Sequence, residues 1–160
     1  MEQKTIDIHS KGDYPANVLS NFYPNEFELD GVRCASMEGF LQSLKFKNPK
    51  KQEMVCALVG KDAKKKGKKK FLWKLTGNIY WRGEKLKRES IPYLSLISRA
   101  YAEMARQSKE FRLALMSTIG AKLTHSIGKN NTKKTILTED EFIYCLTLLR
   151  EDTSLLVHSG

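Results

Sequence analysis

The sequence predicts an α+β fold that is mostly helical, with a small antiparallel sheet near the N-terminus and one domain over residues 1–160. Several segments repeat apolar residues at helical spacing behind a capping residue. An Asp30-Gly31 pair lies between two short alternating segments, a pattern typical of a tight hairpin. With 160 residues, 41% hydrophobic and 29% charged, the chain has the composition of a globular domain.

The first elements follow from local signals. Residues 4–9 alternate enough to predict a short edge strand. Asp30-Gly31 can supply the positive φ angles of a two-residue turn, so a hairpin is expected around it. Ser36 is the expected N-cap of the following helix. The apolar stripe of that helix is Met37, Phe40, Leu41 and Leu44.

Further helices are expected along the rest of the chain. Asn48-Pro49 predicts a helix over residues 49–58, with Met54, Ala57 and Leu58 facing inward. A short helix is expected to begin near Asp62 and to break at Gly67. Its successors are capped by Ser90 and Ser108, the second with Phe111, Ala114, Leu115 and Ile119 inward. The last carries a capping box of Thr138 and Glu141, with a staple of Leu137 and Phe142.

Charge and cysteine content bear on partners and location. The formal net charge is +10, and much of it lies in one lysine block: Lys61, Lys64 to Lys66, Lys68 to Lys70 and Lys74. Such a field favours polyanions, although a lysine-rich surface that only maintains solubility is the simpler alternative. No apolar run is long enough to span a membrane, and no membrane partner is expected. The three cysteines have no metal or redox spacing, which indicates reduced thiols in a cytoplasmic protein.

Glu38 is the strongest catalytic candidate. It falls in the first turn of the helix that follows Ser36, and Gln42 and Lys45 share its polar stripe. The helix dipole favours its ionised form, whereas burial would oppose ionisation. A carboxylate that stabilises a cation or activates water is therefore favoured over an acid. The structural alternative is a glutamate that only stabilises the helix N-terminus.

Other candidates are scattered along the chain. Trp81 could stack on a base while Arg82 holds a phosphate, or Trp81 could be a half-buried aromatic. His125 has no second histidine or cysteine nearby, so no metal site is predicted, and no cofactor motif is present. The glycine-basic loop from Gly128 could bind phosphate through backbone amides. The expected substrate-binding residues are Ser20, Asn21, Phe22, Gln42, Lys45, Trp81, Arg82, His125, Ser126 and Gly128.

Residues 19–46 resemble the first signature of the NADAR family, also called YbiA-like proteins. That signature reads LSNFYP, then a hairpin, then S-x-E-x-x-x-Q-x-x-K-F. Its counterparts here are Leu19 to Pro24 and Ser36, Glu38, Gln42, Lys45 and Phe46. The resemblance extends over residues 18 to about 150 and implies a YbiA-like domain.

The resemblance also implies an N-glycosidase with Glu38 as its catalytic glutamate and Asn21, Phe22 and Gln42 lining the pocket. Two departures stand out. Many members have histidine after that glutamate, where this chain has Gly39. Many also carry a W-G-x-G motif with a nearby aspartate, where this chain has the segment 125–128, HSIG. Trp81 and His125 are the candidates to replace the missing groups.

Three functions follow as hypotheses. The first is a metal-independent N-glycosidase that cleaves a ribose–base bond in an ADP-ribose conjugate, such as ADP-ribosylated guanosine, with nucleic acid held by Lys64–Lys70. The same chemistry on ribosylated pyrimidine phosphates of riboflavin biosynthesis is the alternative substrate. The second is a non-catalytic module that binds ADP-ribose or nucleic acid. The third is a degenerate family member that serves only as an interaction module.

Overall fold

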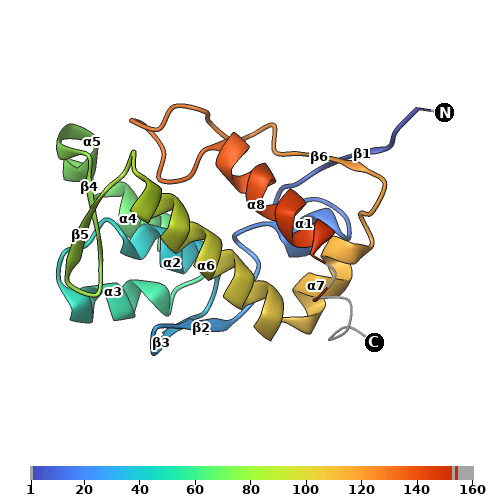
Figure 1. Ribbon diagram of the computed structural model, residues 1–160. Coiled ribbons are helices and arrows are strands. Elements are labelled where there is room, and N and C mark those ends of the chain that lie inside the picture. The colour runs from blue at the N-terminus through green and yellow to red at the C-terminus, as the bar shows by residue number, and fades with distance from the viewer. Residues whose placement is uncertain (1, 153, 155–160) are drawn as a thin grey trace.

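The computed structural model describes residues 2–152 and 154. Its helices are α1 (Ala16–Leu19), α2 (Met37–Ser43), α3 (Pro49–Cys56), α4 (Gly60–Lys68), α5 (Leu72–Thr76), α6 (Ile91–Gln107), α7 (Lys109–Met116) and α8 (Glu139–Glu151). Its strands are β1 (Thr5–Asp7), β2 (Phe27–Leu29), β3 (Val32–Cys34), β4 (Asn78–Trp81), β5 (Glu84–Lys87) and β6 (Lys122–Thr124). Helices dominate, and the strands form only small two-stranded sheets (Figure 1). The predicted α+β, mostly helical class is confirmed.

Two of the sheets are antiparallel hairpins with the same kind of turn. The predicted hairpin joins β2 to β3, and Asp30 and Gly31 have φ angles of 51° and 81°. A second hairpin joins β4 to β5, where Arg82 and Gly83 have φ angles of 50° and 88°. The sequence did not predict this second hairpin, because arginine is not typical of a left-handed turn position.

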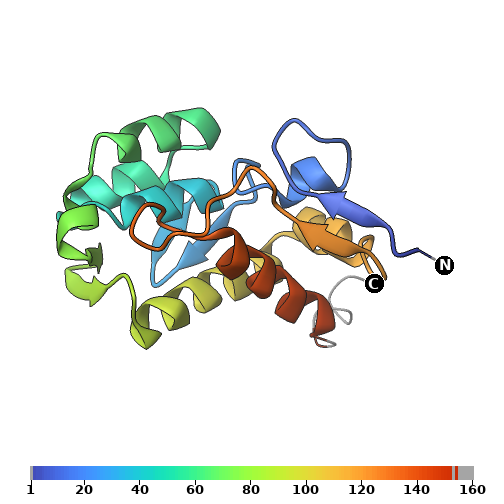
Figure 2. The same ribbon diagram turned by 90° about the horizontal axis from the view of Figure 1, so that it is seen from above.

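The third sheet joins the two ends of the chain. Strand β1 was expected, but its partner β6 was not, and the two pair in parallel with Thr5 opposite Lys122 and Asp7 opposite Thr124. They lie side by side in both ribbon views (Figures 1 and 2). The segment that begins at His125 is therefore held by the N-terminal strand.

The core lies around α2 and the long helix α6. All four apolar residues of the predicted α2 stripe are buried. Two of the three predicted inward residues of α3 are wrong, since Met54 is 70% exposed and Ala57 is also exposed, whereas Leu58 is half-buried. Val55 and Cys56 are buried instead, because α3 packs its C-terminal end against α2. Ile119 is exposed as well, since α7 ends at Met116.

The predicted capping residues are confirmed, because capping depends on a few adjacent residues. Ser36, Asn48, Ser90 and Ser108 each accept a hydrogen bond from a backbone amide of the helix that they precede. The capping box of Thr138 and Glu141 is complete. Glu141 also forms a two-point ion pair with the buried Arg88, which in turn lies 4.5 Å from the centre of the Tyr93 ring. This cluster ties α8 to the end of β5.

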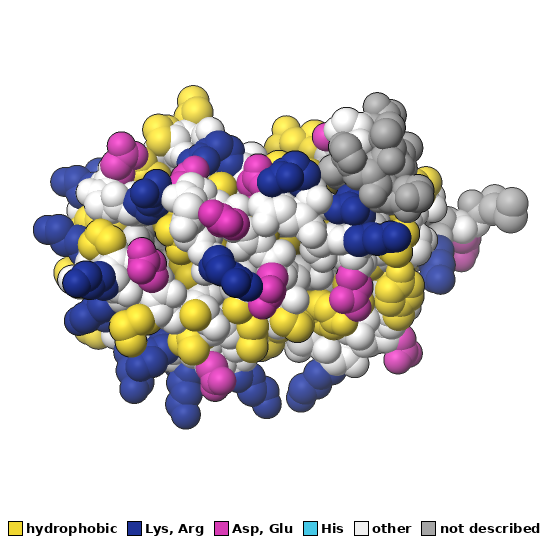
Figure 3. Space-filling model, turned by 90° about the horizontal axis from the view of Figure 1, so that it is seen from below, with side chains coloured by type: hydrophobic (Ala, Val, Ile, Leu, Met, Phe, Trp, Pro, Cys, Tyr) yellow, Lys and Arg dark blue, Asp and Glu magenta, His cyan; other side chains and the backbone are white. Residues whose placement is uncertain are grey.

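The distribution of charge on the surface is mixed. In the view from below, Lys and Arg project from the left and lower edges, while Asp and Glu are interspersed among them across the middle (Figure 3). No helix in the described part of the chain is long and apolar enough to cross a bilayer. The three cysteines are buried and free of disulfides, as the sequence indicated.

Candidate active site

Helix α2 places Glu38 at the wall of a cavity. The Ser36 hydroxyl accepts from the Gly39 amide, which starts the helix one residue before Met37. The Glu38 amide donates to the Asn21 carbonyl at 3.0 Å, so the loop before the hairpin closes over the first turn. The Glu38 side chain is only 9% exposed, and Gln42 Nε2 donates to its Oε1 at 2.8 Å. The predicted polar stripe therefore holds the carboxylate from one side.

The cavity has a volume of about 540 Å³ and lies between α2, α4 and the segment that follows β6. Figure 2 shows that segment in orange, passing from β6 toward α8. A volume of this size suits a nucleotide-sized ligand. Eight of the predicted site residues line it: Ser20, Asn21, Phe22, Glu38, Gln42, Lys45, His125 and Gly128. Glu38 is the only acidic residue among the described residues of this lining.

Lysines surround this single carboxylate. Four lysines of the predicted block line the cavity, whereas the rest of the block does not: Lys64, Lys68, Lys70 and Lys74. Three further lysines join them from the turn after α2 and the segment after β6: Lys45, Lys129 and Lys134. The ammonium group of Lys64 lies 5.9 Å from the centre of the Phe22 ring. We call these seven residues the lysine rim.

Burial sets the ionisation of the groups inside the cavity. It raises the pKa of Glu38, although the Gln42 hydrogen bond and the charges of Lys45 and Lys64 act in the opposite direction. Burial therefore outweighs the stabilising effects that favour the ionised form. Burial also lowers the pKa of Lys45 to about 8, against the attraction of Glu38. A raised pKa makes Glu38 a stronger base than an ordinary glutamate.

His125 reaches the cavity from the opposite side. Its Nδ1 lies 2.7 Å from the Ile8 carbonyl oxygen, and a proton on Nδ1 leaves Nε2 as the acceptor of the neutral ring. The ring also packs edge-on against Phe142, with 5.1 Å between ring centres. Asp7 accepts hydrogen bonds from the residues on either side, Thr124 and Ser126. Strand β1 therefore positions His125 through contacts that lie 117 residues apart in the chain.

Four predicted roles differ from the observed ones. Trp81 lies in the core, where it donates to Asp30 Oδ2 at 2.8 Å and packs on Phe40, so it does not line the cavity. Arg82 occupies the β4–β5 turn, also outside the cavity. Ser126 is bonded to Asp7 and does not line it either. Gly128 does line it, but its amide donates to the His125 carbonyl at 2.9 Å and is not free for phosphate.

Comparison with known proteins identifies the family of this chain. The sequence model of the family described as bacteriophage protein GP30.3 matches residues 13–151. The chain belongs to the GP30.3 family. A relative described as an uncharacterized 17.1 kDa protein in the Gp30-rIII intergenic region of Enterobacteria phage T4 is 40% identical over 147 residues, which are 91% of this chain and 97% of the relative.

The fold is also similar to that of a bacterial protein. The NMR structure of the Escherichia coli protein YbiA is similar to this structure with a TM-score of 0.65 and 20% identity. The similarity covers 100% of this chain and 90% of that chain. The predicted NADAR (YbiA-like) resemblance is therefore confirmed for family and fold.

The GP30.3-family chain also uses site residues that the sequence did not single out. The Tyr101 hydroxyl donates to Asn21 Oδ1 at 2.7 Å, which leaves the amide NH₂ of Asn21 as its free donor end. Tyr101 lies among the buried residues of α6, so helical spacing alone gives no sign of this polar contact. Lys134 comes from a polar loop with no apolar period, so no pattern in the sequence located it, whereas Lys129 belongs to the glycine-basic loop that the sequence had indicated.

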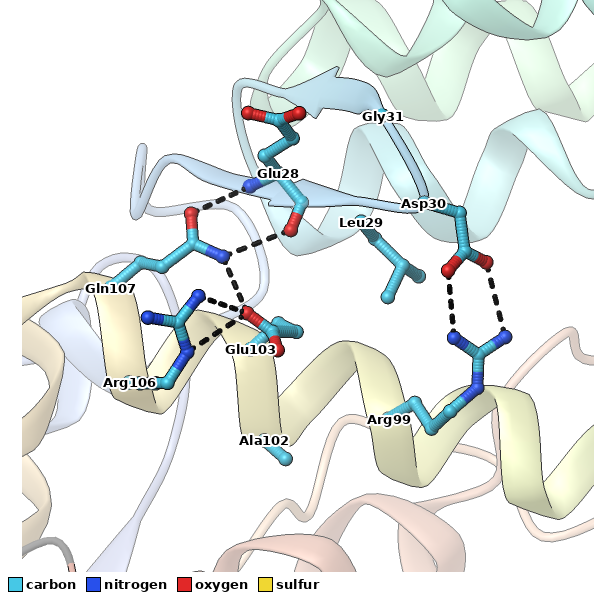
Figure 4. Close-up of a pocket in the computed structure, with 9 residues that line it drawn as sticks. All are labelled: Glu28, Leu29, Asp30, Gly31, Arg99, Ala102, Glu103, Arg106 and Gln107. Atoms are coloured by element: carbon cyan, nitrogen blue, oxygen red, sulfur yellow. Dashed lines mark hydrogen bonds and ion pairs between the residues drawn. The ribbon is translucent and has the colours of Figure 1, made fainter.

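A second groove in this GP30.3-family structure lies between β2 and α6 (Figure 4). Four of the five charged side chains in its described lining are paired, Asp30 with Arg99 and Glu103 with Arg106, while the fifth belongs to Glu28. The Gln107 amide bonds both backbone groups of Glu28 and so covers the edge of β2. Because most of these polar groups satisfy one another, we take the Glu38 cavity as the candidate functional site.

Gly67 controls the orientation of Gln42. The glycine does not break α4 as predicted but lies inside it, and a β-carbon there would fall 1.6 Å from Gln42 Oε1. We expect Gly67→Ala to push the amide aside, break its bond to Glu38 and lower activity at least about tenfold. The fold should survive, because the clash meets the end of a flexible side chain. Unchanged kinetics in a folded Gly67→Ala protein would show that the Gln42 bond is dispensable.

Proposed function

We propose that this protein is an N-glycosidase that hydrolyses a ribose–base bond. The observation that carries the proposal is a lone buried carboxylate, Glu38, in a cavity lined by seven lysines. Cleavage of a ribosyl C–N bond develops positive charge on the sugar ring, which a nearby carboxylate stabilises. Phosphate groups on the same substrate require the opposite charge, which the lysine rim supplies.

The proposed reaction assigns a role to each wall. Glu38 accepts a proton from water as the water oxygen bonds to the anomeric carbon and the C–N bond breaks. His125 lines the same cavity and can deliver a proton to the departing base. Phe22 offers a ring on which the base can stack, with Lys64 beside it for a phosphate. No metal takes part in this scheme.

The proposed substrate is an ADP-ribose conjugate, with ADP-ribosylated guanosine, free or in nucleic acid, as the first example. The size of the cavity and the lysine rim support a ligand with more than one phosphate. A ribosylated pyrimidine phosphate remains the alternative substrate. We propose the cytoplasm as the location, in keeping with three buried free cysteines.

The deciding experiment compares product release from both substrates by the wild-type protein and two variants. Wild-type protein should release ADP-ribose or ribose phosphate, and Glu38→Gln should not. Glu53→Gln is the matched control, because Glu53 is an exposed residue of α3 outside the cavity. Full activity in a folded Glu38→Gln protein would refute the assignment.

The lysine rim also favours a second candidate, a non-catalytic module that binds ADP-ribose or nucleic acid. Calorimetry with ADP-ribose and no turnover of either substrate would support it. Absence of binding to any ribosyl ligand would instead favour a protein that acts only as an interaction module.

Under either function, oligonucleotide binding should weaken steeply with salt. Each lysine that neutralises a phosphate adds about 0.9 to the slope of log affinity against log salt concentration. Lys64→Ala is therefore expected to reduce the slope by about one. Lys51→Ala, on the exposed side of α3, should leave it unchanged. A flat salt response in the wild-type protein would rule out polyanion binding by the rim.

A further inference from the structure

A separate basic pocket lies on the other side of α5. Its volume is about 470 Å³, and it lies between α5, the end of β5 and residues 132–133. The residues that line it carry polar groups, among them Trp73, Lys74, Lys87, Glu89, Thr132 and Lys133. We call it the Trp73 pocket. Of its described lining residues, only Lys74 also lines the Glu38 cavity.

Trp73, which lines this pocket, carries a hydrogen-bond donor that lacks an acceptor. Trp73 is 4% exposed, and its indole N–H has no partner. Among the buried side-chain atoms of residues 2–152 and 154, it is the only donor in this state. Trp81, by contrast, donates its indole N–H to Asp30. Buried donors are normally paired, so an unpaired one that lines a cavity points to an acceptor supplied by a ligand.

The charges around the pocket select an anionic acceptor. Lys74, Lys87 and Lys133 line it, and Lys87 uses part of its ammonium group on Thr76 O and Asn78 Oδ1. The one acidic residue of the described lining, Glu89, already accepts from the Thr132 hydroxyl.

Two more cations lie near these groups. Arg88 lines the pocket but is engaged by Glu141, so it adds little free charge. The ammonium groups of Lys45 and Lys74 lie 5.6 and 6.0 Å from the centre of the Trp73 ring, which strengthens the positive field at the indole. The balance of the pocket is therefore positive.

We propose that the Trp73 pocket binds a phosphate group, with the Trp73 indole N–H and the ammonium groups of Lys74 and Lys133 as its donors. Phosphate oxygens accept several hydrogen bonds at once, and lysines suit them as point charges. Lys74 lines both this pocket and the Glu38 cavity, so the two sites adjoin. The phosphate is either a free ion or a group on the substrate beyond the reacting ribose.

Two-dimensional ¹⁵N–¹H NMR tests this directly, because the chain has two tryptophans and therefore two indole signals. Trp81→Phe assigns them. On titration with inorganic phosphate at constant ionic strength, the Trp73 signal should shift to saturation and the Trp81 signal should stay. Lys133→Ala should weaken binding about fivefold, the effect of one exposed charged contact. Lys85→Ala, an exposed lysine of the same basic surface on β5, should not.

The proposal is overturned by a Trp73 signal that does not move, by a shift that chloride reproduces, or by equal effects of Lys133→Ala and Lys85→Ala. A second set of assays, which rests on the proposed function, separates the two sources of phosphate. If the phosphate belongs to the substrate, Lys133→Ala raises KM for ADP-ribosylated guanosine within an oligonucleotide but not for the mononucleotide. If it is a free ion, neither KM changes. Lack of turnover would refute the proposed function and leave the NMR result standing.

Discussion

Glu38→Gln is expected to lower the rate of N-glycosidic hydrolysis by about 10³-fold, the scale of a lost catalytic base or a lost charge at the transition state. The substitution preserves shape and can still accept from Gln42 Nε2. It removes only the negative charge and the basicity. Single-turnover kinetics with ADP-ribosylated guanosine measures the effect, and a loss of less than about tenfold would remove Glu38 from the chemical step.

The same variant should be more stable than the wild type at neutral pH. Burial raises the pKa of Glu38, so the folded state binds its proton more tightly than the unfolded state does. The contribution of Glu38 to stability is thus greatest below the ordinary pKa of glutamate and falls as pH rises through the raised value. Glu38→Gln should melt above the wild type at pH 7 and level with it below about pH 4. A lower melting temperature at pH 7 would contradict this balance.

The raised pKa of Glu38 also predicts the pH at which activity falls on the acid side of the pH–rate profile. If Glu38 acts as a base, activity falls as it is protonated, at a pH above that of an ordinary glutamate. Lys64→Ala removes a charge that favours the ionised form, so it should move this fall in activity to higher pH. The matched substitution Lys51→Ala should not move it, because Lys51 lies outside the cavity.

Gly39→Ala is expected to destabilise the fold by about 3 kcal/mol, the scale of an overpacked core. A β-carbon at Gly39 would lie 2.5 Å from the Leu58 carbonyl oxygen and 2.9 Å from that of Cys56. These are backbone atoms where α3 ends, and they cannot rotate away. The packing also accounts for glycine where many NADAR proteins have histidine. Urea unfolding measures the change.

The expected loss of stability in Gly39→Ala is opposite to the usual effect of this substitution in a helix. Replacing glycine by alanine inside a helix ordinarily stabilises it by about 1 kcal/mol. Gly67→Ala is the natural comparison, because its clash involves the Gln42 side chain and not the backbone. We expect Gly39→Ala to lose stability and Gly67→Ala to lose mainly activity. Equal stability of Gly39→Ala and the wild type would show that α2 and α3 can separate at little cost.

Short-range signals made part of this protein predictable. The Asp30-Gly31 turn, the Ser36 cap and the capping box at Thr138 each depend on neighbours within a few residues, and each is confirmed. The same stretch brought Glu38, Gln42 and Lys45 onto one wall of the cavity. Helical spacing alone is enough to align such a stripe, whatever the rest of the chain does.

Only the tertiary structure decided what meets that stripe. The pairing of β1 with β6 brings His125 to the cavity, and no local pattern encodes a contact over 117 residues. Trp81 instead packs into the core, and its indole N–H donates to Asp30 at the β2–β3 turn. The raised pKa of Glu38 also depends on tertiary packing. The helix dipole acts on every first-turn glutamate, whereas burial depends on all the segments that close over it.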